Sequence, residues 1–280
     1  MSHTIQCYLC KNTIYENKFD QHLEQCFQDK GDKEEIKYAN LNKLQKKVIK
    51  YSNKKAKVYS DGVKKLLLIK IVEWGYTKQD YKDLRKYFRE LFPVVHIKPS
   101  HMKFFIDDTH YRSLFEIGVS GGSNSVICRS KWETNLFGGL YDNCDPKDRV
   151  KYGVINLLNA KSGVNNAHIY GKCHFILKKN TRNRITMTHG DSCIMQYHLG
   201  NYKYFEHILY YLPDSVLKIV LSDFRKGVCQ QVNYAYIEFQ LHGDLRFDRD
   251  IEELVVPLAS KDDPCFAEFC SKYNIKISHY

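Results

Sequence analysis

Four residues near the start of the chain have the types and spacing of a zinc site. Two residues separate Cys7 from Cys10, and three separate His22 from Cys26. Zinc takes thiolate and imidazole ligands in a tetrahedron, and these spacings fit a turn between short strands and one face of a helix. The sequence therefore predicts that residues 1–28 fold around one structural zinc ion. The metal would supply most of the folding free energy of so small a unit.

The stretch CYLCKNTIYENKFDQHLEQC, which contains these four ligands, resembles the Cys-Cys-His-Cys ubiquitin-binding zinc fingers of DNA-damage-tolerance proteins. The resemblance implies that ubiquitin, or a ubiquitinated protein, is a partner. Those fingers usually carry an aspartate that bonds to ubiquitin between the histidine and the last cysteine. Glu24 stands in that place here. A finger that caps the protein or binds nucleic acid is the alternative.

The second half of the chain contains a series of segments dense in polar residues and glycine. In order they are HYRSLFEIGVSGGS (110–123), RSKWETNLFGGLY (129–141), RVKYG (149–153), THGDS (188–192) and YIEFQLHG (236–243). Over roughly residues 94–257 these segments resemble a mainly bacterial family known as domain of unknown function 3626. The resemblance identifies the domain and implies no activity.

An arginine, a polar strand and a glutamate on a late strand are also similar to the layout of Arg-Ser-Glu mono-ADP-ribosyltransferases. Arg112 takes the place of the arginine, whose planar fork would grip the phosphate and ribose of NAD. Glu238 takes the place of the glutamate, which would stabilise the oxocarbenium-like state as nicotinamide leaves. We therefore expect an NAD-dependent, mono-ADP-ribosyltransferase-like enzyme targeted by the ubiquitin-binding finger.

Two features depart from that layout. The usual Ser-Thr-Ser strand is absent, so Thr186-Met-Thr188 or Ser120 and Ser123 would have to serve in its place. The late strand reads Glu238-x-Gln240, the reverse of the usual order, and transferase activity would be weak or altered if Gln240 occupies the catalytic point. Both residues share one face of a regular strand, so both could line one cleft. The residues expected to bind NAD are Arg112, Ser120, Tyr152 and Thr188.

Two other interpretations remain open. The two His-Gly-Asp triplets could build a metal or general acid–base site of a hydrolase or nuclease, with the working groups His189, Asp191, His242 and Asp244. Alternatively the domain only binds, as part of a ubiquitin- or nucleic-acid-binding adaptor. Its charged residues would then form a buried ionic network of Arg112, Glu116, Arg149 and Glu238. No Walker A loop or Gly-x-Ser-x-Gly elbow is present, which argues against P-loop and α/β-hydrolase chemistry.

The elements that would position these residues fall into two kinds. Residues 29–93 are expected to be helical, with Asp61 capping one helix over Val63–Trp74 and Thr77 or Asp80 starting another that runs through Phe92. Residues 94–280 form an α+β domain, β-rich with few helices; one helix follows Pro213 and runs to about Arg225. The expected strands are Val94–Ile97, Phe104–Ile106, Gly153–Leu158, Cys173–Leu177, Arg184–Met187 and Tyr234–Leu241.

Charge and cysteine content limit the partners. The chain has a net charge of +11, and residues 29–98 hold 19 Lys and Arg against 9 Asp and Glu. That segment is either a solvated helical face or a surface for an anionic partner such as nucleic acid. The other seven of the ten cysteines show no pairing pattern, and no apolar segment reaches the length of a membrane span. We expect an intracellular protein, cytoplasmic or nuclear, without a membrane partner.

Overall fold

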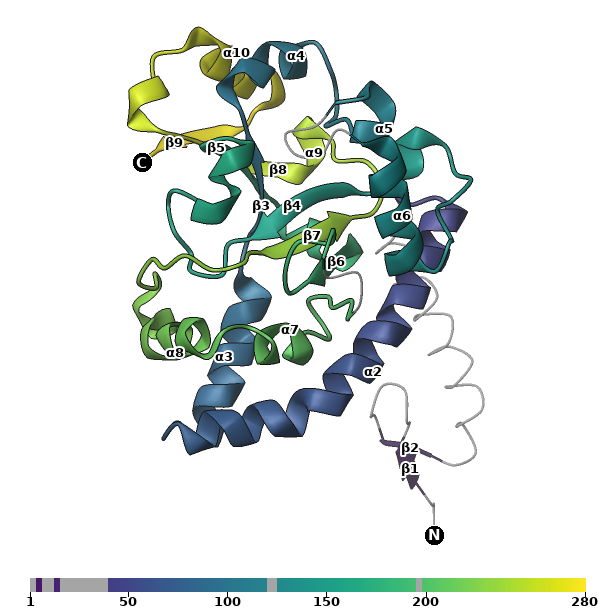
Figure 1. The fold of residues 1–280 in the computed structure, drawn as a ribbon, viewed down its shortest axis with the longest axis vertical. Helices are drawn as coiled ribbons and strands as arrows, with labels where there is room; N and C mark the ends of the chain where they lie inside the picture. Colours follow the sequence, from purple (N-terminus) through teal and green to yellow (C-terminus); the bar gives the residue numbers. More distant parts are fainter. Residues whose placement is uncertain (1–3, 7–12, 16–39, 120–124, 195–197) are drawn as a thin grey trace. The chain divides into compact units, whose positions relative to one another are not determined.

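The computed structural model of the 280-residue chain describes residues 4–6, 13–15, 40–119, 125–194 and 198–280 (Figure 1). The chain divides into two units, residues 1–40 and 41–280. In the first unit, β1 (Thr4–Gln6) pairs antiparallel with β2 (Thr13–Tyr15). These are the short strands expected on either side of the Cys7 and Cys10 turn. The predicted zinc ligands Cys7, Cys10, His22 and Cys26, and also Glu24, lie outside the described residues.

The second unit is built on a mixed sheet of seven strands in the order β6-β7-β4-β3-β5-β8-β9. Neighbouring strands are antiparallel except for β8 and β9, which are parallel. The strands are β3 (Pro93–Ile97), β4 (Lys151–Ile155), β5 (Cys173–Leu177), β6 (Ile185–Thr188), β7 (Ile237–Leu241), β8 (Ile251–Val256) and β9 (Lys276–His279).

The two faces of this sheet differ because side chains alternate along each strand. One face carries apolar side chains such as Val95, Phe175 and Phe239, which belong to the main core. On β4, β6 and β7 the opposite face carries mainly polar side chains, among them Glu238 and Thr188, which the strand register places side by side. An apolar face must pack against other elements, and the polar face can provide a site.

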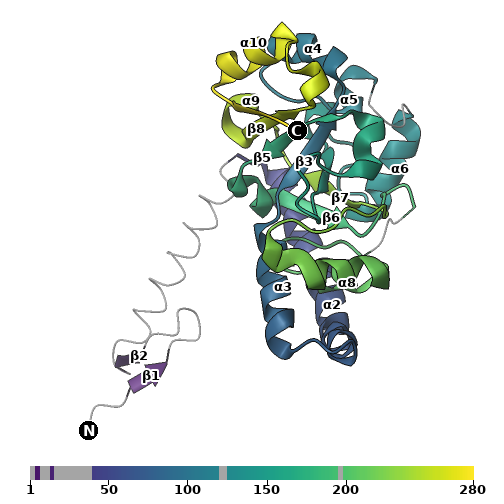
Figure 2. The same cartoon turned by 90° about the vertical axis from the view of Figure 1, so that its left-hand side faces the viewer.

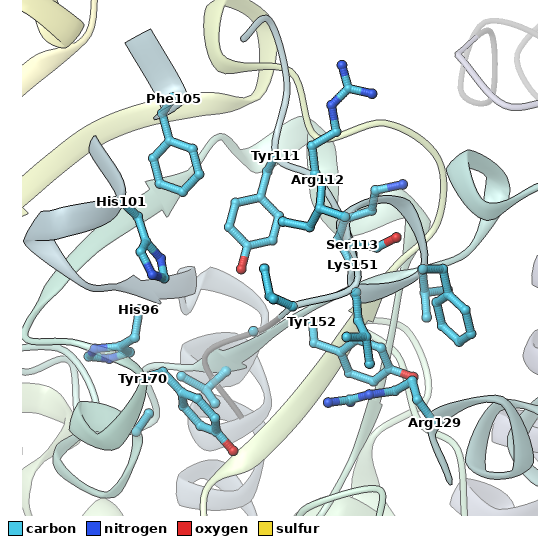
Figure 3. A pocket seen from close by; sticks show the side chains of 18 of the residues that line it. His96, His101, Phe105, Tyr111, Arg112, Ser113, Arg129, Lys151, Tyr152 and Tyr170 are labelled. Carbon is cyan, nitrogen blue, oxygen red and sulfur yellow. The ribbon is translucent and has the colours of Figure 1, made fainter. Parts of the chain in front are cut away.

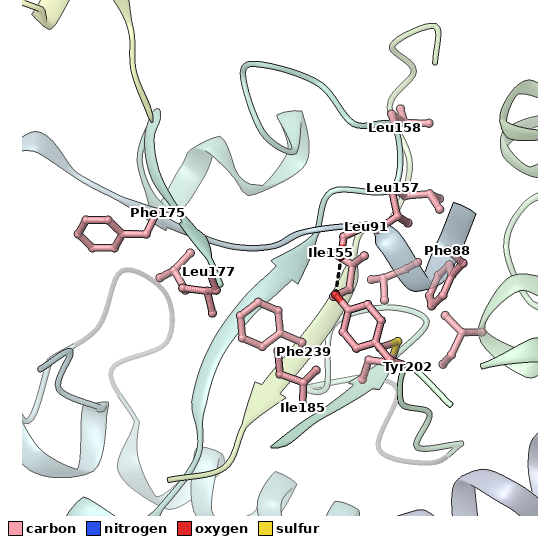
Figure 4. Close-up of a cluster of buried hydrophobic side chains, with 14 of the residues drawn as sticks. Phe88, Leu91, Ile155, Leu157, Leu158, Phe175, Leu177, Ile185, Tyr202 and Phe239 are labelled. Carbon is pink, nitrogen blue, oxygen red and sulfur yellow. Dashed lines mark hydrogen bonds between the residues drawn. The ribbon is translucent and has the colours of Figure 1, made fainter. Parts of the chain in front are cut away.

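The helices of the second unit surround the sheet (Figures 1 and 2). Figures 1 and 2 place α8 across α3, and Arg225, which follows α8, pairs with Asp83 of α3 at 2.8 Å. Figure 4 shows Phe88 of α3 near Ile155 and Tyr202, whose hydroxyl donates to the Leu91 carbonyl at 3.1 Å. The helices are α2 (Lys43–Glu73), α3 (Lys78–Glu90), α4 (Met102–Ile106), α5 (Leu114–Ile117), α6 (Val126–Phe137), α7 (Glu206–Tyr210), α8 (Asp214–Asp223), α9 (Phe247–Asp250) and α10 (Pro264–Tyr273).

Helices α2 and α3 share the core of the sheet. Leu67 and Ile71 of α2 and Leu84 and Phe88 of α3 are buried in the main core. The residues expected to form a helical segment of their own, 29–93, therefore include helices that the sheet needs for its packing. The predicted helix boundary at Asp61 is wrong, because no proline interrupts the α2 segment and Asp61 pairs with Lys57 one turn earlier.

Three further expectations differ from the structure. Phe104–Ile106 lies in α4 and not in a strand, because Met102, Phe105 and Ile106 have helical spacing and turn toward one core. The strands β8 and β9 were not expected. The expectation of few helices after residue 94 is wrong as well, since the described residues there include seven α-helices, α4 to α10.

Candidate active site

A pocket opens where β3 and β4 diverge. The two strands pair only at Pro93 with Ile155 and at Val94 with Val154. Beyond these pairs the strands separate, and a cavity of about 430 Å³ lies between His96 and the Lys151–Val154 stretch (Figure 3). This volume is within the usual range for small-molecule sites. The aromatic lining residues are Phe104, Phe105, Tyr111, Phe115, Tyr152, Tyr170 and Tyr236. The ionisable lining residues besides the tyrosines are His96, His101, Asp108, Arg112, Arg129, Lys151 and Glu238.

Glu238 is the buried carboxyl group of this pocket. It is 6% exposed, and the side-chain amide of Gln240 donates to its Oε1 at 3.1 Å. Burial raises its pKa from 4.5 to about 7, and the negative charge of Asp191 adds to this effect. A carboxyl group with such a pKa is populated in both protonation states near neutral pH. It can therefore donate or accept a proton in a reaction.

Two tyrosines connect the pocket to Asp191. The hydroxyls of Tyr170 and Tyr236 are 2.9 Å apart, and Tyr236 donates to Oδ2 of Asp191 at 2.7 Å. Tyr170 and Tyr236 line the pocket, whereas Asp191 lies behind them. Asp191 belongs to the loop after β6, and the β6–β7 register places this loop at the Glu238 end of β7. The Thr188-His-Gly-Asp-Ser192 segment thus brings a second carboxyl group close to Glu238.

Among the cations that line the pocket, Arg129 of α6 is the one whose charge lowers the pKa of Glu238. Its guanidinium carbon lies 4.2 Å from the centre of the Tyr152 ring. The Tyr152 hydroxyl donates to Oε1 of Glu133 at 3.1 Å, and Glu133 pairs with Arg149 at 2.9 Å. Burial raises the pKa of Glu133 to about 7. This network fixes the ring on which Arg129 rests.

Arg112 also lines the pocket, but its guanidinium is already bound. Its Nε and Nη2 donate to the two carboxylate oxygens of Asp108 at 2.7 and 3.0 Å, and Nη1 lies 3.6 Å from Glu116. In Figure 3 the guanidinium points away from Tyr152. Arg112 and Glu238 therefore line the same cavity, but the guanidinium of Arg112 binds Asp108 in the cavity wall.

The other predicted site residues are divided between the pocket and the layer behind it. Tyr152 lines the cavity. Thr188 is fully buried and donates to the Gly190 carbonyl at 2.7 Å, and Gln240 is fully buried beside Glu238 on the same face. Neither Thr188 nor Gln240 reaches the cavity. Ser120 lies outside the described residues.

The two His-Gly-Asp triplets do not form one site. The β6–β7 register pairs Ile185 with Leu241 and Thr188 with Glu238, so His189 and His242 follow opposite ends of this ladder. His242 is fully buried and shares a hydrogen bond of 2.8 Å with the Tyr141 hydroxyl. Burial lowers its pKa to about 3.

The remaining groups of the two triplets are also separated. The His189 ring packs at 5.2 Å from the ring of Tyr211, and Asp244 is exposed at the surface. Within the described parts of the chain, no cluster of three His, Cys, Asp or Glu side chains could hold a metal ion.

The charged network expected for a domain that only binds is only partly present. Glu116 pairs with Arg112 and with Lys151, and Arg149 pairs with Glu133. Glu238 makes no ion pair with the described residues, so it stands apart from these pairs.

Sequence reasoning did not single out Arg129, Tyr170 or Tyr236. Tyr236 could have been found, because it has the same parity as Glu238 and Gln240 along the strand. Arg129 lies within a quoted motif, but nothing in the sequence distinguishes it from the other arginines of the chain. Tyr170 ends a 3₁₀ turn over Asn165–Tyr170, and only the tertiary structure brings it to the cavity.

Part of the second unit matches a known protein family. No helix among the described residues is both long enough and apolar enough to span a membrane. A comparison with curated proteins found no match. Residues 98–218 match the family described as protein of unknown function (DUF3626), and this stretch includes Arg112, Arg129, Tyr152 and Asp191 but ends before Glu238. The domain resemblance in the second half of the chain is thus supported from α4 into α8.

Proposed function

We propose that the pocket between β3 and β4 is the active site of an enzyme that transfers ADP-ribose from NAD, with Glu238 as its acid–base carboxyl group. The observation that carries the proposal is a buried carboxyl with a pKa of about 7, set in an aromatic pocket together with an arginine. Aromatic rings offer stacking surfaces for the planar nicotinamide or adenine, and a guanidinium is suited to phosphate.

The reaction assigns a definite task to Glu238. The bond between ribose C1′ and the nicotinamide nitrogen breaks, and its electron pair leaves with nicotinamide. An acceptor nucleophile forms the new bond to C1′, and its proton passes to the Glu238 carboxylate. Because the carboxylate form is required, turnover should rise as pH increases through about 7.

The direct test is nicotinamide release from labelled NAD by the full-length protein, with ubiquitin among the acceptors. Glu238→Gln keeps the shape of the side chain but cannot take up the proton, so we expect a rate loss on the order of 100-fold or more. The matched control is Glu252→Gln, which changes an exposed glutamate of β8 and should leave the rate unchanged. Equal release by wild type and Glu238→Gln would remove Glu238 from the mechanism.

A binding-only role is the second candidate, and the occupied guanidinium of Arg112 favours it. In this case the protein is an adaptor, and α2 offers lysines to an anionic partner such as nucleic acid. Lys47, Lys50 and Lys54 are exposed on that helix. The adaptor proposal gains support if NAD is bound but never cleaved.

Residues 1–28 are proposed to bind one zinc ion and to recognise ubiquitin. Support comes from the Cys-Cys-His-Cys spacing and from the β1–β2 pairing on either side of residues 7–12. We expect one zinc per chain by elemental analysis, and Cys10→Ser should lose the metal while the melting of residues 41–280 is unchanged. Purified wild type without zinc would contradict this prediction. Weakened ubiquitin binding by Glu24→Ala would support the partner.

A further inference from the structure

We infer that Arg129, and not Arg112, binds a phosphate group of the ligand in this pocket. The inference deepens the proposed function and rests on it, because it takes the cavity between β3 and β4 to be the ligand site. It assigns the ligand to one class, molecules that combine a planar ring with a phosphate, as nucleotides do.

The side chain of Arg129 is oriented toward the cavity. Arg129 lies in the first turns of α6 and is half-buried. Its guanidinium lies over the Tyr152 ring at 4.2 Å and faces the Trp132 ring at 5.1 Å. Figure 3 shows the side chain extending along Tyr152 toward the side of the cavity where Tyr170 lies. An arginine stacked on a ring keeps its N–H groups available at the edge of the plane, which is the geometry that phosphate oxygens bind.

The cations that line the cavity differ in their ion pairs. The cavity is lined by three Lys or Arg residues, Arg112, Arg129 and Lys151. Arg112 pairs with Asp108 at 2.7 Å, and Lys151 pairs with Glu116 at 3.3 Å. Arg129 has no carboxylate within ion-pair distance among the described residues. The Tyr152 and Trp132 rings and the more distant charges of Glu238 and Glu133 favour the charged guanidinium and raise its pKa, so Arg129 stays cationic and no salt bridge has to break before an anionic ligand binds.

Arg129 and Glu238 line the same cavity and interact electrostatically. Phe105 and Tyr111, whose ring centres are 5.7 Å apart, line the cavity with them and offer apolar surface for a planar ring. A ligand with its phosphate at Arg129 would thus keep its sugar close to Glu238.

The experiment titrates ADP, and adenosine as the phosphate-free analogue, into the full-length protein by calorimetry. Wild type should bind ADP more tightly than adenosine, and added salt should weaken ADP binding only. Arg129→Gln should reduce ADP affinity about 10- to 100-fold, as expected for a charge-assisted hydrogen bond, and leave adenosine affinity unchanged. The matched control, Arg112→Gln, should keep ADP affinity within about threefold, because that guanidinium is held by Asp108.

The outcomes separate this inference from the proposed function. If ADP or NAD binds and Arg129→Gln binds as well as wild type, or if Arg112→Gln is the variant that fails, the inference is wrong and the NAD proposal stands. If wild type binds none of ADP, adenosine and NAD, both fail. Should Arg129→Gln melt well below wild type, Arg129→Lys carries the test. It retains the charge but loses the planar fork, and ADP affinity should still fall several-fold.

Discussion

Glu238 and Glu133 are buried carboxyl groups that both act electrostatically on Tyr152 and Arg129, and burial raises the pKa of each to about 7. Glu133 accepts a hydrogen bond from Tyr152 and pairs with Arg149, so its role is to hold the wall of the pocket. Glu238 receives one hydrogen bond from Gln240 and lines the cavity. The two carboxyl groups have similar pKa values, so their partners distinguish the structural role of Glu133 from the reactive role proposed for Glu238.

The raised pKa of Glu238 predicts a pH-dependent effect on stability. In the unfolded chain this carboxyl loses its proton near 4.5, and in the folded chain near 7. Its contribution to stability is therefore fully present below 4.5 and is lost as pH rises through 7. Glu238→Gln cannot ionise, so it should be more stable than wild type at pH 8, by on the order of 3 kcal/mol at most. At pH 5 most of the unfolded chain but little of the folded chain is ionised at this group, and the difference should be under about 1 kcal/mol.

Urea unfolding at pH 5 and pH 8 measures this difference. Asp191→Asn provides a second measurement, because removing its negative charge should lower the pKa of Glu238 in a carbon-13 NMR titration. A Glu238→Gln stability difference that is the same at both pH values would show that Glu238 titrates normally.

At the scale of elements, the site depends on how closely β4 and β7 approach. Gly153 of β4 lies opposite Phe239 of β7. A Cβ at Gly153 would lie 2.4 Å from the Phe239 ring and 2.6 Å from the Val94 carbonyl oxygen. Because Gly153 has no side chain, the Phe239 ring packs directly against β4, the strand that also carries Tyr152 of the pocket wall.

Two glycine substitutions should therefore have opposite effects. Gly153→Ala overpacks the core and should lower the free energy of unfolding by about 1–3 kcal/mol. Gly62→Ala lies within α2, where a Cβ would meet nothing within 4 Å, and should raise it by about 0.5–1 kcal/mol. Thermal melts of both variants check the two signs. Stabilisation by Gly153→Ala would contradict the packing described here.

At the scale of the molecule, residues 41–280 form one unit with a shared core. The boundary expected between residues 93 and 94 runs through that core. Removal of α2 and α3 would expose apolar side chains of the sheet now covered by Leu67, Ile71, Leu84 and Phe88. Burial of a leucine- or phenylalanine-sized side chain contributes about 1.5–3 kcal/mol, and whole domains are stable by only about 5–15 kcal/mol.

We therefore expect residues 41–280 to melt cooperatively and residues 94–280 to lack a cooperative transition. Circular dichroism melts of the two fragments, with proton NMR dispersion as a second readout, test this expectation. A cooperative melt of residues 94–280 would show that the sheet carries a sufficient core without α2 and α3.

The sequence by itself determined the features that depend on local pattern. The strands β3 and β5 and the helices α3 and α8 were predicted close to their observed bounds, because their residues have the periodicity and caps of those elements. The shared face of Glu238 and Gln240 also followed from the two-residue repeat of a strand, and the hydrogen bond between them confirms it.

Only the tertiary structure decided which side chains meet. Arg112, Tyr152 and Glu238 reach one cavity because β3 and β4 pair briefly and then separate, and this strand order is not written in any local pattern. The guanidinium of Arg112 is bound by Asp108, while Arg129 and Tyr170 arrive from a helix and a 3₁₀ turn. Such contacts depend on the packing of distant segments, whose free energy exceeds what local propensity can specify.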